Sequence, residues 1–275
     1  MVTKPILVLG ATGKTGARIA AQLDAKGLPV RRGSRSAAIP FDWNAPETWG
    51  AVLEGVSAVY ISYYPDIAVP GAVEAVEAFV AQAREAGVGK LVLLTGRGEY
   101  HAQQAEEVVR HAGLTFTIVR AAWFAQNFSE GALHAPVMAG MLPMPGGDVQ
   151  EPIVDVDDIA DVAVAALSED DHDGQLYEVT GPRLMSFAGM AEALTVATGR
   201  QIAYVPISFE DFYAALLETQ GEMIADVLTG IARETLDGRN AHLTDGVQRA
   251  LGRPPRDFTT FAMAAARTGA WDAAP

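Results

Sequence analysis

A glycine-rich turn near the N-terminus places the strictest constraint on the fold of this chain. It follows an apolar run at 6–9 and reads Gly10-Ala11-Thr12-Gly13-Lys14-Thr15-Gly16. A helical pattern comes next, with Ile19, Ala20 and Leu23 on one face. Strand, glycine turn and helix in this order let the backbone approach a pyrophosphate, whose charge the N–H groups and positive dipole end of the helix stabilise. The stretch therefore predicts a dinucleotide-binding site.

Two other interpretations of the turn have to be weighed. The spacing is G-x-x-G-x-x-G, which also occurs in plain strand-to-helix turns, so this alternative stays open. Lys14-Thr15 resembles the end of a P-loop, but two residues separate Gly10 from Gly13 where a P-loop has four. Hydrolysis of a nucleoside triphosphate is therefore not expected.

The composition excludes several classes of protein. The 275 residues, 49% of them hydrophobic, suffice for one large α/β domain with a smaller lobe. A net charge of −14 disfavours nucleic acid as a partner, and the apolar runs are too short for a membrane span. The chain has no cysteine, and its histidines are scattered without a metal-binding spacing. We expect a cytoplasmic protein without a metal site, a nucleic-acid partner or a membrane partner.

Strand and helix patterns alternate over the first two thirds of the chain. This predicts an α/β fold, a doubly wound parallel Rossmann-type sheet, with a smaller and mostly helical C-terminal lobe. The expected domains are 1–182, interrupted by a first lobe segment at about 123–150, and 183–275. Strands are expected at 6–9, 28–32, 58–61, 90–94, 115–120, 175–180 and 202–205, and a further short strand is expected to end near 41–43. A helix is expected to begin with a cap at 156–158, and later helices at 186–198, 208–220, 223–235 and 258–268.

Arginines follow the second expected strand, where an NAD-specific site would present an acidic residue to the ribose hydroxyls. The sequence has Arg31, Arg32 and Arg35 in this region. A guanidinium matches a 2′-phosphate in charge and in fork geometry. We therefore expect NADP(H) in preference to NAD(H), with Arg35 as the main contact. The alternative is that these arginines form a solvated surface cluster.

Further candidates lie where expected strands end, because ligands bind at the carboxyl edge of such sheets. Asp42 could face the adenine amino group and Trp43 its ring, although Trp43 fits the core equally well. For the remaining residues in this group, ordinary packing is the competing interpretation. The cofactor candidates are Ser62, Tyr63, Tyr64, Thr95 and Gly96. The candidates for an apolar substrate pocket are Trp123, Phe124, Asn127 and Phe128, near a methionine-rich stretch at 138–144.

These motifs together resemble the NmrA-like family, a branch of the atypical short-chain dehydrogenase/reductase superfamily. The resemblance spans residues 6 to about 182 in family order. It implies a Rossmann-type NAD(P)-binding domain and a small variable lobe, but no single substrate. Besides the glycine turn, it rests on Leu93-Leu94-Thr95-Gly96, Thr117-Ile118-Val119-Arg120, Trp123-Phe124 with Asn127, the stretch 152–160 and Tyr177-Glu178-Val179-Thr180-Gly181-Pro182.

The chain departs from the superfamily at its usual catalytic dyad. Typical members carry Tyr-x-x-x-Lys, in which the lysine lowers the pKa of the tyrosine, and a serine near the end of the strand before it. Here Thr95 stands where that serine is expected, and Tyr100 is followed four residues later by Gln104. No lysine occurs after Lys90. Thr95 and Tyr100 remain the catalytic candidates, but the usual ketone–alcohol chemistry is disfavoured.

Two classes of function fit this sequence. The first is an NADP(H)-dependent oxidoreductase that passes hydride to a small apolar conjugated acceptor, such as a quinone or an enone, without the dyad. The alternative is a non-catalytic NAD(P)-binding redox sensor that acts through a protein partner, as the resemblance to NmrA implies. Isomerase or dehydratase chemistry has no supporting motif. A homo-oligomer is compatible with either function.

Overall fold

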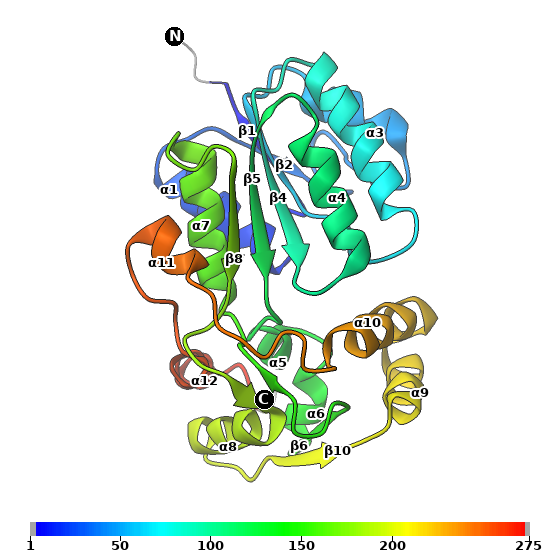
Figure 1. The fold of residues 1–275 in the computed structure, drawn as a ribbon, viewed down its shortest axis with the longest axis vertical. Helices are drawn as coiled ribbons and strands as arrows, with labels where there is room; N and C mark the ends of the chain where they lie inside the picture. Colours follow the sequence, from blue (N-terminus) through cyan, green and yellow to red (C-terminus); the bar gives the residue numbers. More distant parts are fainter. Residues whose placement is uncertain (1–3, 273–275) are drawn as a thin grey trace.

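The computed structural model describes residues 4–272, and a six-stranded parallel sheet lies at the centre of this part of the chain. The strand order is β2-β1-β3-β4-β5-β8 (Figure 1). The predicted doubly wound α/β fold is confirmed. The strands of this sheet are β1 (Ile6–Leu9), β2 (Val30–Gly33), β3 (Ala58–Ile61), β4 (Lys90–Gly96), β5 (Thr115–Ala121) and β8 (Gln175–Val179).

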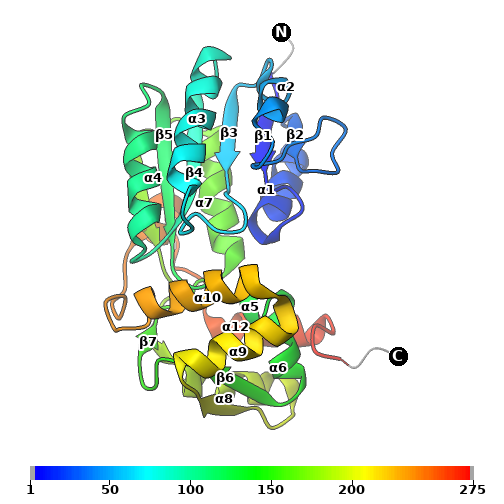
Figure 2. The ribbon, with the colours of Figure 1, turned by 90° about the vertical axis from the view of Figure 1, so that its right-hand side faces the viewer.

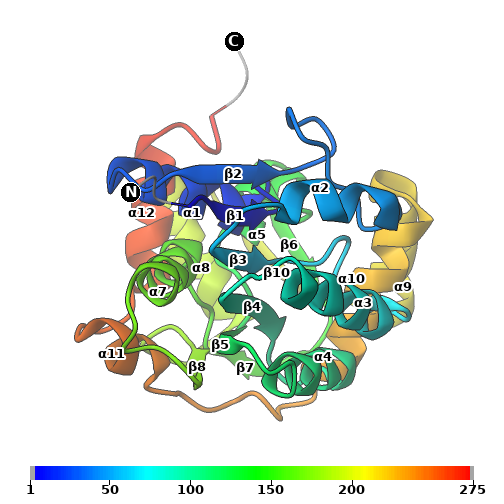
Figure 3. The ribbon, with the colours of Figure 1, turned by 90° about the horizontal axis from the view of Figure 1, so that it is seen from above.

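Helices cover both faces of the sheet, which explains why its strands are nearly continuous apolar runs. Figure 3 shows one group of helices on each side. On one face lie α1 (Lys14–Ala25), α7 (Val156–Ser168) and α11 (Gly246–Leu251). On the other lie α2 (Trp49–Leu53), which follows a 3₁₀ turn at Pro46–Thr48, α3 (Ala72–Glu85) and α4 (Tyr100–Arg110).

The remaining elements form a lobe with its own apolar core. Figure 2 shows this lobe below the carboxyl ends of the strands, with α10 nearest to the sheet. Two small sheets strengthen it, a parallel pair of β6 and β10 and an antiparallel pair of β7 and β9. Its elements are α5 (Asn127–Glu130), α6 (His134–Met138), β6 (Met141–Met144), β7 (Gln150–Glu151), β9 (Met185–Ser186), α8 (Phe187–Thr198), β10 (Ala203–Pro206), α9 (Phe209–Gln220), α10 (Glu222–Thr235) and α12 (Phe258–Arg267).

Two local predictions were wrong. Residues 41–43 form a loop and not part of a strand. The sheet ends at β2, so no further strand pairs there, and the Asp42 carbonyl instead accepts a hydrogen bond from the Trp49 indole at 2.8 Å. Helix α7 is capped by the residue before the expected 156–158 stretch. The Asp155 carboxylate accepts from the Asp157 backbone N–H at 2.9 Å, as an N-cap should.

The last third of the chain returns to the sheet after building much of the lobe. Val247 in α11 packs into the core between the sheet and α7, although 183–275 was expected to belong to the lobe. In the loop that follows, the Arg256 backbone N–H donates to Asp158 of α7 at 2.6 Å, and the Arg253 guanidinium pairs with the same buried carboxylate at 2.8 Å. These contacts fasten the lobe to the sheet.

Within residues 4–272, none of the helices has the length and apolar character needed to cross a membrane. The same part of the chain holds no cluster of metal-ligating side chains.

Candidate functional site

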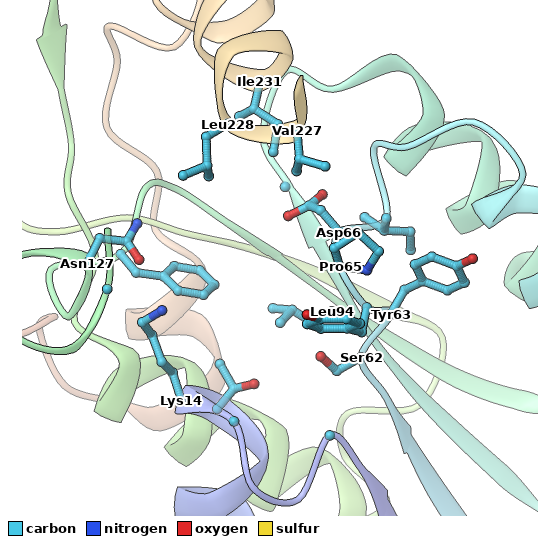
Figure 4. Close-up of a pocket in the computed structure, with 18 of the residues that line it drawn as sticks. Lys14, Ser62, Tyr63, Pro65, Asp66, Leu94, Asn127, Val227, Leu228 and Ile231 are labelled. Atoms are coloured by element: carbon cyan, nitrogen blue, oxygen red, sulfur yellow. The ribbon is translucent and has the colours of Figure 1, made fainter. Parts of the chain in front are cut away.

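A cleft of about 920 Å³ lies between the carboxyl edge of the sheet and the lobe. The glycine turn and the ends of β2, β3, β4 and β5 form one wall, and α10 with the segment after β5 forms the other (Figure 4). This is the position in which open α/β sheets bind their ligands.

The glycine turn is closed by its own backbone. Gly10 has a φ of +63°, a conformation that favours glycine, and its carbonyl accepts from the Gly13 N–H at 2.8 Å. A Cβ on Gly16 would lie 2.2 Å from the Gly10 carbonyl oxygen, so only glycine lets α1 pack this closely on the turn. The turn residues that line the cleft are Gly10, Thr12, Gly13, Lys14 and Thr15. Gly16 does not line it but packs against the Gly10 backbone.

Lys14 provides the cation at this end of the cleft, into which its side chain points (Figure 4). Burial lowers the pKa of its ammonium group, and the nearby Glu130 opposes that effect. Arg18, one turn later, donates to the Lys14 carbonyl at 2.8 Å and pairs with Asp157 at 2.8 Å and Glu130 at 2.7 Å. The start of α1 is thereby fixed to both α7 and the lobe.

The three arginines near β2 differ in their partners. Arg31 donates to the carbonyls of Val52 and Glu54, and Arg32 pairs with Asp24, so both have structural contacts. Arg35 lines the cleft with its guanidinium carbon 5.5 Å from the centroid of the Tyr64 ring. Within residues 4–272, no carboxylate lies within salt-bridge distance of Arg35. Arg35 is therefore the arginine of this group that is available to an anion.

The other candidates at the sheet edge also line the cleft. Trp43 lines the cleft and is also packed in the core. It is 7% exposed within an aromatic cluster, its indole N–H donates to the Ser62 carbonyl at 3.0 Å, and its ring centroid lies 4.8 Å from that of Tyr63. The cleft-lining residues here are Asp42, Trp43, Ser62, Tyr63, Tyr64, Thr95 and Gly96.

The two catalytic candidates occupy different surroundings. The Thr95 hydroxyl is buried at the end of β4 and donates to Glu106 at 2.8 Å, and Glu106 in turn accepts from Arg120 at 2.8 Å. Tyr100 is 62% exposed outside the cleft lining, and its hydroxyl accepts from Gln104. The structure therefore contradicts Tyr100 as a group that acts within the cleft.

The structure brings three of the four residues expected for an apolar substrate pocket to the cleft. Trp123, Phe124 and Asn127 line the cleft, but Phe128 does not. The Phe128 ring is 1% exposed and lies 5.2 Å from the Phe258 ring in the lobe core, because α5 turns this side of its short helix inward. Helix α10 supplies an apolar wall that the sequence did not predict, and this wall consists of Val227, Leu228 and Ile231 (Figure 4).

Two acidic residues that the sequence did not predict also line the cleft, Asp66 and Glu99. Burial raises the pKa of Glu99 well above its usual range, and the nearby carboxylates of Asp66, Glu234 and Glu106 raise it further. Burial likewise raises the pKa of Asp66, against the opposing hydrogen bond from the Ala68 N–H. Asp66 could have been found, because it follows Pro65 directly after the strand end that supplied Ser62. No comparable sequence signal marked Glu99.

Sequence comparison decides the family. A model described as NAD(P)H-binding matches residues 10–170, more than half of the chain. The chain belongs to this NAD(P)H-binding family. The Rossmann-type fold that the resemblance to NmrA-like proteins implied is confirmed, since a structure of mutant NmrA has the same fold. The glycine cradle beneath the cleft fits a dinucleotide, since a Cβ at its third glycine would collide with the turn.

Several reductases are similar to this chain over nearly its whole length. An NAD(P)H azoreductase of Xenophilus azovorans is 33% identical, over 94% of this chain and 97% of the relative. The structure of an NADPH-dependent quinone oxidoreductase of Escherichia coli superposes with a TM-score of 0.77 at 21% identity, over 96% and 99% of the two chains. A triphenylmethane reductase of Citrobacter sp., solved with NADP(H), gives 0.75 at 21%, over 95% and 99%. These findings place the chain among NAD(P)H-binding oxidoreductases.

Proposed function

We propose that this protein is an NADPH-dependent reductase that transfers hydride to a small, flat, conjugated acceptor such as a quinone or an enone. The observation that carries the proposal is the continuity of the cleft, which runs from the glycine turn to the apolar face of α10. A cleft of about 920 Å³ has room for a second, apolar molecule beside a dinucleotide. The azoreductase and the quinone oxidoreductase among its relatives support an acceptor of this class.

The residues of the sheet wall fit the parts of NADPH in order. Gly10, Gly13 and the first turn of α1 would hold the pyrophosphate, with Lys14 beside it. Arg35 would bind the 2′-phosphate, and Asp42 would lie toward the adenine. Ser62–Tyr64 and Thr95-Gly96 would border the nicotinamide, which supplies the hydride when bound.

The side chains on the acceptor side of the cleft are suited to holding a flat acceptor in a fixed position. Trp123, Phe124 and Leu228 present flat or branched apolar surfaces to the cleft. Because the usual tyrosine–lysine dyad is missing, we assign rate enhancement chiefly to the alignment of the acceptor against the cofactor. An aromatic slot of this kind favours a planar conjugated molecule over a flexible alcohol or ketone.

The change Arg35→Ala tests the cofactor assignment. Loss of a charge-assisted contact to the 2′-phosphate should cost about 1.5–3 kcal/mol, equivalent to roughly 10- to 100-fold weaker NADPH binding. NADH has no 2′-phosphate, so its binding should not change. Fluorescence titration with each cofactor measures both, and Arg32→Ala, which removes a surface pair with Asp24, is the matched control. Equal weakening of NADPH and NADH would contradict this role of Arg35.

Turnover separates the reductase from the sensor. The purified protein with NADPH should reduce members of a panel of quinones, enones and azo dyes. If it binds the oxidised cofactors far more tightly than NADPH and reduces no acceptor in the panel, the sensor function is the correct one. Failure to bind any of the four nicotinamide dinucleotides would contradict both functions.

A further inference from the structure

Asp66 and Glu99 place two carboxyl groups at the acceptor end of the cleft, that of Glu99 buried and that of Asp66 half-buried. Asp66 comes from the loop after β3 and Glu99 from the loop between β4 and α4. Figure 4 shows the Asp66 carboxylate directed into the cleft beneath Val227 and Leu228 of α10. Glu99 is 7% exposed, and both residues line the same space.

The Glu99 carboxyl lies directly over the end of β4. A Cβ on Gly96 would lie 2.0 Å from its Oε1 and 2.3 Å from its Oε2, so the carboxyl occupies the room that this glycine leaves free. Gly96 and the preceding Thr95 also line the cleft. The group is thus held at the sheet edge where we place the nicotinamide.

Glu99 makes none of the contacts that would explain it as a structural residue. It is the N-cap residue of α4, but its side chain does not cap the helix. Glu234 of α10 accepts from the Tyr100 N–H in its place, at 2.8 Å. Within residues 4–272, Oε2 of Glu99 has no hydrogen-bond partner at all.

The cations nearby are bound to other groups. Arg120 pairs with Glu106 of α4, and Arg97 pairs with Glu178 at 2.6 Å. Arg239 bonds to Asp237 and to the Gly98 carbonyl. Within the described chain, no cation reaches salt-bridge distance of Asp66 or Glu99, while Asp66, Glu106 and Glu234 all add negative charge around Glu99.

A carboxyl group that is buried without a cation beside a second carboxyl group is stabilised by holding a proton, because its ionised form is poorly solvated there. The reduction of a neutral acceptor needs a proton as well as a hydride, and the usual tyrosine is absent from this cleft. We propose that Glu99 holds this proton, with the Asp66 carboxylate nearby, and delivers it to the acceptor. This rests on the proposed reductase function and names the proton donor for it.

A quinone gains a hydride, with its electron pair, from bound NADPH at one carbonyl oxygen, and the displaced π electrons move through the ring, which becomes aromatic, onto the other quinone oxygen. The Glu99 O–H bond breaks, and its proton bonds to that oxygen. NADP⁺, the neutral hydroquinone and an ionised carboxyl pair result, and the pair regains one proton from solvent.

A cationic acceptor provides an internal control for this step. A triphenylmethane dye cation becomes neutral on gaining hydride alone and needs no proton. Glu99→Gln keeps the shape of the side chain but removes the acidic proton. It should lower kcat for a neutral quinone by about 100-fold or more, the usual contribution of a positioned acid, and should leave reduction of the dye cation largely unchanged.

The pH dependence gives a second result that a structural role would not produce. Quinone reduction should fall as pH rises, because the donor must be protonated. In Asp66→Asn the loss of a neighbouring negative charge lowers the pKa of Glu99, so the fall should move to lower pH. Glu222→Gln, at an exposed position at the start of α10, is the control and should leave this pH dependence unchanged.

Infrared spectroscopy tests for the proton on Glu99 without turnover. The wild type should show a protonated carboxyl C=O band that Glu99→Gln lacks. Equal slowing of quinone and dye by Glu99→Gln, unchanged quinone reduction, or absence of the band would each overturn the carboxyl pair while leaving the reductase function intact. A wild type that reduces neither acceptor would contradict the reductase function and, with it, the pair.

Discussion

The two walls of the cleft are built in different ways. The sheet wall is made of a glycine turn and strand ends, and its shape is set by the backbone, as the contact between Gly16 and Gly10 shows. The lobe wall is made of side chains on α10, held by contacts between distant residues, such as the 3.1 Å hydrogen bond from the Trp123 indole to Thr235. We infer that the cofactor side tolerates few substitutions and that the acceptor side tolerates many.

The largest loss of NADPH binding is expected from Gly16→Ala, which disrupts the packing of the sheet wall. The new Cβ would collide with the backbone of Gly10 and force α1 away from the turn. Overpacking of this kind costs about 3 kcal/mol, and we expect roughly 100-fold weaker NADPH binding. Titration calorimetry measures the change.

The control for Gly16→Ala is Gly50→Ala in α2. A Cβ on Gly50 meets no described atom within 4 Å, so this change should leave NADPH binding intact. If Gly16→Ala binds NADPH as tightly as the wild type does, the sheet wall is not fixed by its backbone and the contrast between the walls fails.

An effect of similar size, on stability and not on binding, is expected at Glu151 of β7, on the lobe side. Burial raises the pKa of this carboxyl from its ordinary 4.5 to about 7, and neither oxygen has a hydrogen-bond partner within residues 4–272. Because the folded pKa lies above the unfolded one, its contribution to stability is complete below about pH 4.5 and is lost as pH rises through about 7. The loss is on the order of 3 kcal/mol.

Glu151→Gln should therefore flatten the pH dependence of stability. Urea unfolding at acidic and at mildly alkaline pH gives the free energy of unfolding of both proteins, and the wild type should lose more of it. Glu192→Gln, on the exposed side of α8, should behave like the wild type. An equally steep loss in Glu151→Gln would assign the pH sensitivity to other groups.

The smallest effect is expected from Leu228→Ala, which sharpens the contrast from the acceptor side. Removing part of a half-buried apolar side chain from α10 should cost about 1 kcal/mol of acceptor binding, or roughly fivefold in KM. NADPH binding should not change. Met223→Ala alters an exposed residue of the same helix and should change neither quantity. Weaker NADPH binding in Leu228→Ala would show that the walls are not independent.

The sheet wall was largely predictable because its determinants are local. Apolar runs, the glycine turn and the position of each strand end are set by neighbouring residues, so Gly10, Ser62 and Thr95 were placed at one edge from sequence alone. The arginines show the limit of this reasoning. That Arg31 and Arg32 are bound elsewhere while Arg35 is not depends on partners in other elements.

The lobe wall could not be predicted because it depends on long-range packing. Phe128 and Phe124 look equivalent in sequence. Phe128 nevertheless lies in the lobe core, where its ring packs against Phe258, far along the chain. Glu99 resembles any exposed acid after a turn, and its burial comes from the space over Gly96. The short strands β6 and β7 likewise exist only through pairing with distant partners.

The arrangement of α9 and α10 has a consequence for how such proteins diverge. These two helices follow each other in the chain, pack against each other and supply the α10 side of the acceptor wall from one contiguous stretch, 209–235. The other segments of the lobe alternate along the chain with segments of the sheet domain, so they cannot be exchanged as one piece. Replacing this helical hairpin with that of a relative should change the acceptor preference and leave the cofactor site unchanged. Residues 209–235 are therefore the segment through which recombination can alter specificity in one step.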